Sequence, residues 1–285
     1  MALEVHSLAS GSSGNSILVK DGRDAVLIDA GISMRRITRG LMSVGVNPAD
    51  LSAILITHEH SDHVASAVQI AAKYGVPIVG NAPTLSAVGC AEHVRHKVMD
   101  AREELLVGNL LVRPFAISHD AACPVGYSIS SSTATVCSAT DTGVLTPEIR
   151  AEAMRADVLI IESNHDAEML RTGPYPHHIK RRIASERGHL SNDATAGLLI
   201  DLADSGRDVA VWLAHLSKTN NTPATALTTA QYLLWSCLGT SLDMRVAARD
   251  VPSLSWRQAD RPYQLALFER PLGDRPPPGE HLCAV

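Results

Sequence analysis

The sequence predicts an α/β protein built as a four-layer α/β/β/α sandwich, in which two β-sheets lie between two layers of helices. Three observations support this fold class. β-rich runs alternate with helical segments twice along the 285 residues, so the chain resembles two similar halves. The composition, 45% hydrophobic and 19% charged, is that of a globular protein with a buried core. No run of 18 or more apolar residues breaks the pattern.

The first half opens with short β-runs separated by glycine, serine and aspartate turns, which is typical of a β-hairpin. A helical pattern of apolar residues follows, and then a strand, a helix and a strand in βαβ order. The predicted strands span residues 3–9, 17–20, 25–31, 53–57 and 77–79, and the predicted helices span residues 33–44 and 62–74.

The second half begins with several β-rich runs between residues 105 and 139 and then alternates helices with apolar strands. Helices are predicted at residues 147–155, 166–171, 179–186, 192–204 and 224–237, and strands at residues 157–162 and 209–214. Because the two halves share this order, their sheets are expected to pack face to face under outer helices.

The composition changes after about residue 251, where proline and arginine become frequent. We therefore expect one domain over residues 1–250 and a partly ordered tail over residues 251–285, with one short strand at residues 264–268. No chemistry is assigned to the tail.

Charge and cysteine content exclude several classes of protein. A net charge of −5 argues against a basic particle that coats nucleic acid, so a polyanion must bind locally. The N-terminus lacks an export signal, which favours a soluble cytoplasmic protein with no membrane partner. The five cysteines are odd in number and never form a CxxC pair, so neither a disulfide framework nor a thiolate zinc site is expected.

The strongest chemical signal is the segment THEHSDH at residues 57–63, between an apolar strand and a helix. His58 and His60 are two apart at a strand end, so both can point at one metal ion. Asp62 and His63 open the next helix and can turn toward a second ion, as in two-metal hydrolases. The alternative, a polar loop that happens to be rich in histidine, does not explain three histidines and an aspartate in six residues.

Further ligand candidates follow later strands. His119 ends one β-run, Asp141 lies in the turn after another, and His215 closes the run AVWLAH. Each is a weak signal alone, because a single histidine at a strand end is commonly a hydrogen-bonded structural residue. Together with the first cluster they form a coherent set at one edge of a sandwich.

These motifs, with Asp29 in LIDAG upstream, resemble the metallo-β-lactamase-fold superfamily over roughly residues 1–220. The resemblance implies two metal ions bridged by Asp141. It assigns His58, His60 and His119 to one ion, and Asp62, His63 and His215 to the other. Asp29 would accept a hydrogen bond in the histidine loop, although a plain turn aspartate before glycine explains it equally well. Nitrogen and oxygen ligands admit zinc, manganese or iron.

Four more segments narrow the family: SLASGSSGNS at residues 7–16, ESNHD at 162–166, GHLSN at 188–192 and HLSKTNN at 215–221. In this order they resemble the YycJ/WalJ group of small bacterial proteins, described as DNA exonucleases acting from the 5′ end. The resemblance implies a phosphodiesterase that uses a hydroxide bridged by two metal ions, with Asp62, Asp141 and His189 as catalytic residues. His189 would act as general acid, oriented by Glu162, and its alternative is a helix-cap histidine.

Several residues are candidates for binding the nucleic-acid substrate, with DNA favoured. The basic run near Lys180, Arg181 and Arg182 would bind backbone phosphates, although a solvated helix face explains most such runs. The loop containing Ser13 and Asn15 would form an anion nest for a 5′ phosphate. The remaining candidates are His165, beside His189 or on a helix surface, and Asn220 and Asn221 in the last motif.

Two other functions stay open. A small-molecule hydrolase of the same fold, acting on a cyclic phosphodiester, lactone or thioester, would use the same ligands. A non-catalytic metal-binding scaffold should lack ligands, and here all seven positions are filled. Neither DNA versus RNA nor the oligomeric state is fixed by the residues.

Overall fold

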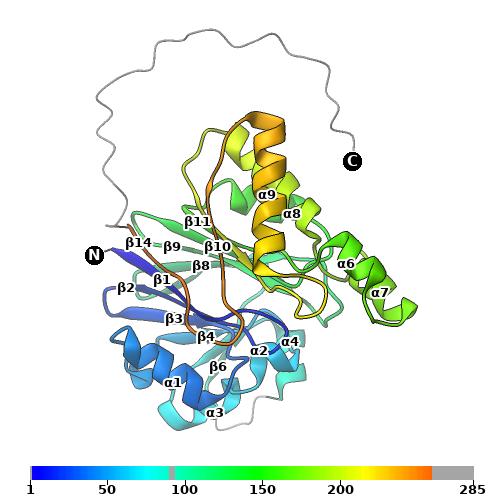
Figure 1. Ribbon diagram of the computed structural model, residues 1–285. Coiled ribbons are helices and arrows are strands. Elements are labelled where there is room, and N and C mark those ends of the chain that lie inside the picture. The colour runs from blue at the N-terminus through cyan, green and yellow to red at the C-terminus, as the bar shows by residue number, and fades with distance from the viewer. Residues whose placement is uncertain (1, 90–93, 259–285) are drawn as a thin grey trace, which may run out of the picture.

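Two seven-stranded sheets pack face to face in the computed structural model, which describes residues 2–89 and 94–258. Helices cover the outer face of each sheet, so the four-layer α/β/β/α sandwich is confirmed (Figure 1). The first sheet has the strand order β14 (Ser255–Arg257), β1 (Leu3–Ala9), β2 (Ser16–Asp21), β3 (Asp24–Ile28), β4 (Ala53–Leu55), β5 (Ile78–Gly80) and β6 (His96–Val98).

The second sheet has the strand order β13 (Asp243–Val246), β12 (Ala210–Ala214), β11 (Val158–Glu162), β10 (Thr135–Ala139), β9 (Val125–Ser130), β8 (Leu110–Ala116) and β7 (Leu105–Val107). Each sheet is mixed. β3 to β6 and β10 to β13 run parallel, and the strands before them pair antiparallel. The inner parallel strands, such as β4, β5, β11 and β12, are buried and apolar on both faces because each is covered twice, whereas the edge strands β6 and β13 carry exposed polar residues.

Three apolar layers hold the sandwich together, as the alternation along single strands shows. In β11, Val158 and Ile160 point between the two sheets, while Leu159 and Ile161 point toward the helices. The helices that pack on the first sheet are α1 (Met34–Ser43), α3 (Ala67–Tyr74) and α4 (Ala82–Val88). Those that pack on the second are α5 (Pro147–Ala153), α8 (Asn192–Asp204) and α9 (Pro223–Leu238). None of the helices in the described residues is long and apolar enough to cross a bilayer.

The predicted helix at residues 62–74 is two helices, α2 (Ser61–Val64) and α3. The break lies at Ser66, whose backbone N–H donates to Ala30 O and whose hydroxyl donates to Ile32 O. These bonds tie the start of α3 to the loop after β3, and they take Ser66 out of helical geometry. Two shorter helices, α6 (Ala167–Thr172) and α7 (His177–Ile183), project at one side of the second sheet (Figure 1).

Part of the segment expected to be a tail belongs to the first sheet. β14 pairs antiparallel with β1, and Leu254 and Trp256 pack against the apolar layer between the sheets. The ordered fold therefore extends past the boundary expected at residue 251. The strand expected at residues 264–268 lies outside the described residues.

Candidate metal centre

The predicted ligands meet at one edge of the sandwich because each follows a strand end. β3 leads to Asp29, β4 to the segment His58–His63, β10 to Asp141 and β12 to His215. In the described residues, the non-glycine residues with a positive φ are Asp29 at 58°, Asp141 at 60° and His215 at 53°. This backbone conformation is uncommon, and asparagine, aspartate and histidine adopt it most readily. All three positions thus combine an uncommon backbone geometry with a predicted functional side chain.

The first ligand group contains His58, His60 and His119, and their ligand atoms lie within 4.8 Å of one another. His58 Nε2 is 3.1 Å from His60 Nδ1. Protein contacts hold the opposite nitrogen of two of the rings, since His58 Nδ1 contacts Thr57 Oγ1 and His119 Nδ1 donates to Gly188 O. Each ring therefore directs its other nitrogen into the group.

The second ligand group contains Asp62, His63 and His215, again with ligand atoms within 4.8 Å. Asp62 Oδ2 lies 3.7 Å from His63 Nε2 and 3.8 Å from His215 Nε2. Each histidine is held through its Nδ1 atom, in His63 by Asp29 Oδ2 at 2.7 Å and in His215 by Glu162 Oε1 at 2.7 Å. The two Nε2 atoms are thereby directed at the same space as the Asp62 carboxylate.

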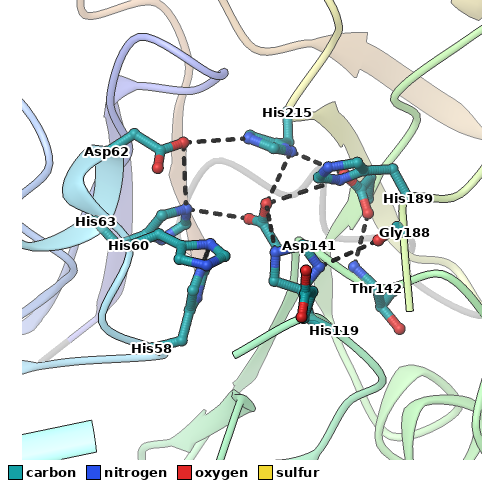
Figure 2. A network of polar contacts seen from close by, with 12 residues as sticks. His58, His60, Asp62, His63, His119, Asp141, Thr142, Gly188, His189 and His215 are labelled. Carbon is teal, nitrogen blue, oxygen red and sulfur yellow. Dashed lines mark hydrogen bonds and ion pairs between the residues drawn. The ribbon is translucent and has the colours of Figure 1, made fainter. Parts of the chain in front are cut away.

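Asp141 lies between the two groups (Figure 2). Its Oδ2 atom is 3.1 Å from His63 Nε2, and its Oδ1 atom is 3.9 Å from His119 Nε2 and 3.4 Å from His215 Nδ1. The carboxylate is buried and reaches residues of both groups. This is the position expected of a bridging ligand.

Asp29 and Thr57 form a buried support beneath the histidines. Asp29 accepts hydrogen bonds from the backbone N–H and the hydroxyl of Thr57, both at 2.9 Å, and from His63 Nδ1. The Thr57 hydroxyl also contacts His58 Nδ1 at 3.0 Å. The expected hydrogen-bonding role of Asp29 is observed, and Thr57, to which the sequence analysis assigned no role, links both ligand groups.

Glu162 supports the other side of the centre. Its Oε1 atom accepts from His189 Nδ1 at 2.8 Å and from His215 Nδ1 at 2.7 Å, while Oε2 accepts from Thr142 N at 2.8 Å. The carboxylate is fully buried. His189 lies 5.1 Å from His119 and 5.4 Å from His215 between ring centroids, and its side chain is 22% exposed. It is thus more open to solvent than the predicted histidine ligands it touches.

The charges of the centre shift the pKa values of its members in opposite directions. Burial lowers the pKa of His215, but the carboxylates of Asp141, Asp62 and Glu162 together outweigh burial and raise that pKa to about 10. Burial likewise lowers the pKa of His189, and Glu162 raises it above its usual value. Burial raises the pKa of Asp141, yet His215 and His63 bring it well below the usual range.

The residues present fit divalent cations. All donors are imidazole nitrogens and carboxylate oxygens, a set that suits zinc, manganese or iron. Among the described residues, two buried atoms that face the centre, Asp141 Oδ2 and His215 Nε2, have ion-pair contacts with other members of the centre but no hydrogen-bond partner. Buried polar atoms are almost always satisfied, so these two are the atoms a cation would bind.

The predicted substrate-binding residues outside the basic run differ in their exposure to solvent. Asn15, His165, Asn220 and Asn221 are buried, and Ser13 is exposed. The Asn221 amide donates to Ser163 O, Asn164 O and Asn192 Oδ1, so it supports neighbouring loops. That Asn221 also contacts substrate stays a prediction. The buried ring atom His165 Nδ1 and both polar atoms of the Asn220 side-chain amide have no hydrogen-bond partner among the described residues.

The basic run lies on α7 and at its C-terminal end, close to the predicted metal ligand His119. Arg182 forms an ion pair with Asp120 at 3.3 Å, and Arg187 contacts both Asp120 and His119 O. Lys180 Nζ donates to Arg171 O at 2.8 Å, and Arg181 is exposed. The cations thus begin beside His119 and continue along α7.

The family model described as the β-lactamase superfamily domain matches residues 24–213. The exodeoxyribonuclease WalJ of Streptococcus pneumoniae is 36% identical over 246 residues, covering 84% of this chain and 91% of the relative. The exodeoxyribonuclease YycJ of Bacillus anthracis is 36% identical over 226 residues, covering 78% and 85%. The crystal structure of the metallo-β-lactamase-fold protein YhfI from Bacillus subtilis superposes with a TM-score of 0.70 at 16% identity, covering 90% of this chain and all of that one.

Proposed function

Because the chain belongs to the β-lactamase superfamily, and within it to the family of the exodeoxyribonucleases WalJ and YycJ, we propose that it is a metal-dependent exodeoxyribonuclease that releases nucleotides from the 5′ end of DNA. The observation that carries the proposal is the arrangement of His189. It lies at the open side of two adjoining ligand groups, where a leaving oxygen can receive its proton.

Two divalent cations would be held by His58, His60 and His119 and by Asp62, His63 and His215, with Asp141 shared. When bound, such ions lower the pKa of coordinated water and neutralise the negative charge of a phosphodiester. Neighbouring residues hold the ligand side chains in orientations that suit metal binding. Asp29 and Glu162 fix the rings of His63 and His215, so that little reorganisation is needed on binding.

His189 would protonate the 3′ oxygen that leaves when the phosphodiester is cleaved. Glu162 accepts the Nδ1 hydrogen, which leaves Nε2 to carry the transferred proton. The Glu162 carboxylate also raises the pKa of His189, so the ring stays protonated nearer neutral pH. A general acid needs its proton at the operating pH, and the pair meets this condition.

The cations on and beside α7 would hold the sugar-phosphate backbone. Arg182 and Arg187 contact Asp120, the neighbour of His119, and Arg181 is exposed further along the helix. Contacts of this kind provide affinity without reading sequence. They suit an enzyme that must move along any strand.

Hydrolysis of end-labelled DNA tests the proposal, with 5′-labelled and 3′-labelled strands compared in Mn²⁺ or Zn²⁺. Stepwise release from the 5′ end that is lost in Asp62→Ala would support the activity and its polarity. Absence of cleavage of any DNA by the metal-loaded protein, together with hydrolysis of a small phosphodiester, would move the assignment to a small-molecule hydrolase.

A further inference from the structure

We propose that the glycine-serine loop, residues 10–16, positions the ligands of only one of the two metal sites, the group of Asp62, His63 and His215. The inference rests on the metal centre of the proposed function, but its test does not depend on nuclease activity. The sequence suggested instead that this loop binds a terminal phosphate through its backbone N–H groups. Four of those groups, on Ser10, Gly11, Gly14 and Asn15, already donate within the protein.

Asn15 connects the loop to two of the ligands. Its backbone N–H donates to Asp62 O at 2.8 Å, and its side-chain Nδ2 atom lies 3.0 Å from His63 Nε2. Its Oδ1 atom accepts from Gly11 N at 2.8 Å, which closes the loop on itself. Asn15 is buried, so these contacts are shielded from water. Asn15 thereby ties the loop to the turn that carries Asp62 and His63, by its backbone N–H at Asp62 and by its side chain at His63 and within the loop.

Ser10 connects the other end of the loop to the third ligand. Its hydroxyl accepts from the backbone N–H of His215 at 2.9 Å. His215 has a φ of 53°, so the orientation of its side chain depends on a backbone conformation that few residues adopt. The segment after β13 also holds this region. Ser10 N donates to Ala248 O, and Arg249 donates to the carbonyl oxygen of Leu216, the residue that follows His215.

The packing leaves the loop little freedom. A Cβ atom at Gly31 would overlap the carbonyl group of Asp62, and one at Gly14 would overlap the carbonyl group of Gly31. Gly31 N also donates to Asn15 O at 2.8 Å. The loop, the turn after β3 and the Asp62 carbonyl thus form one close-packed unit, through which a change in the loop reaches Asp62.

The other ligand group shares the Thr57 hydroxyl with the first-named group, but its remaining supports do not include the loop. His58 contacts Thr57, and His119 is fixed by Gly188 O and by Arg187. Among the described residues, the loop makes no hydrogen bond to His58, His60 or His119. The two sites should therefore respond differently when the loop is altered.

Titration of the chelator-stripped full-length protein with Zn²⁺, with ions per chain counted by mass spectrometry, tests this asymmetry. Wild-type protein should bind two ions. In Asn15→Ala, one ion should remain at wild-type affinity, and the other should bind roughly 10-fold to 100-fold more weakly. Ser10→Ala should weaken the same ion. Asn81→Ala is the matched control, since Asn81 is also buried and hydrogen-bonded but contacts none of these ligands, and it should bind two ions normally.

Double variants identify the ion that remains. Adding His60→Ala to Asn15→Ala should remove it, whereas adding Asp62→Ala should leave it bound. Two ions at wild-type affinity in both loop variants would overturn the proposal, and so would loss of both ions from a folded Asn15→Ala protein. If Asn15→Ala does not fold by circular dichroism, Ser10→Ala decides by the same titration. Wild-type protein that binds two ions but cleaves no DNA would refute the nuclease and leave this proposal to the titration.

Discussion

Replacing His189 with alanine should remove a proton donor and leave the metal centre in place. His189 makes its closest polar contact with Glu162 Oε1, and that carboxylate keeps His215 Nδ1 and Thr142 N as partners in the variant. The side chain is 22% exposed, so its removal opens no large cavity in the core. We therefore expect wild-type metal content and little change in thermal stability.

The expected loss follows from the role of the donor. General acid catalysis contributes roughly 100-fold to 10,000-fold, which corresponds to about 2.7–5.4 kcal/mol of barrier. The loss should appear with DNA, whose leaving 3′ oxygen needs a proton. It should be much smaller with a p-nitrophenyl ester of thymidine 5′-phosphate, because that leaving group departs as a stable anion.

The assay measures turnover of both substrates by His189→Ala and wild-type protein over a range of pH. With DNA, wild-type activity should fall as pH rises through the raised pKa of His189, since the acid form is then lost. In Glu162→Gln the fall should begin at lower pH. Equal losses on both substrates, or unchanged turnover of DNA in His189→Ala, would refute the assignment of His189 as general acid.

Three further results are expected. Zn²⁺ binding at pH 7.5 should release about one proton or more per chain, because the pKa of His215, about 10, keeps its ring protonated until a cation binds Nε2. Calorimetry in buffers of different ionisation enthalpy measures the number of protons released, and zero release would contradict the expectation. Gly31→Ala should lower the free energy of unfolding by roughly 1–3 kcal/mol or more, because the new Cβ would overlap the Asp62 carbonyl group. Gly197→Ala in α8, where a Cβ meets open space, should raise the free energy of unfolding by about 0.5–1 kcal/mol. Equal effects of the two variants in denaturant titrations would contradict the close packing of Gly31 against Asp62. Arg181→Glu should weaken the binding of single-stranded DNA to metal-free protein and reduce the salt dependence of that binding. Arg39→Glu, which changes an exposed arginine on α1, should alter neither quantity. Matching DNA-binding curves for both variants, measured by fluorescence anisotropy, would exclude α7 as the phosphate-binding face.

That the histidines and aspartates of the centre come together could be predicted because their signals are local. His58, His60, Asp62 and His63 lie within one short segment, and their neighbours in space follow other strand ends. Strand ends on one edge of a sandwich come together whatever the loop sequences are, so residue type and strand position were enough. The positive φ of Asp141 adds a feature that no spacing reveals.

The supports of the ligands could not be predicted from the sequence, because they depend on contacts between distant segments. Thr57 joins Asp29 to His58 through one hydroxyl, and Gly188 holds His119 through a backbone carbonyl. A threonine or a glycine gives no sign of such a role. Asn221 is a similar case, since its amide supports neighbouring loops through hydrogen bonds that its motif does not reveal.

The errors in the predicted elements have the same physical origin. Residues 62–74 have a helical pattern throughout, but the bond from Ser66 N to Ala30 O interrupts the helix. β14 lies in a segment whose composition suggested a tail, yet three residues suffice when β1 offers an unpaired edge. Tertiary hydrogen bonds decided both cases against the local sequence.

If two metal ions at this centre cleave DNA from the 5′ end, the products of end-labelled strands show it most directly. The measurement is the time course of products from a 5′-labelled and a 3′-labelled strand, for metal-loaded wild-type protein beside Asp141→Ala. We expect early release of labelled mononucleotide from the 5′-labelled strand, a ladder of shortening products from the 3′-labelled strand, and neither in the variant. Equal activity in Asp141→Ala, or shortening from the 3′ end, would contradict this expectation.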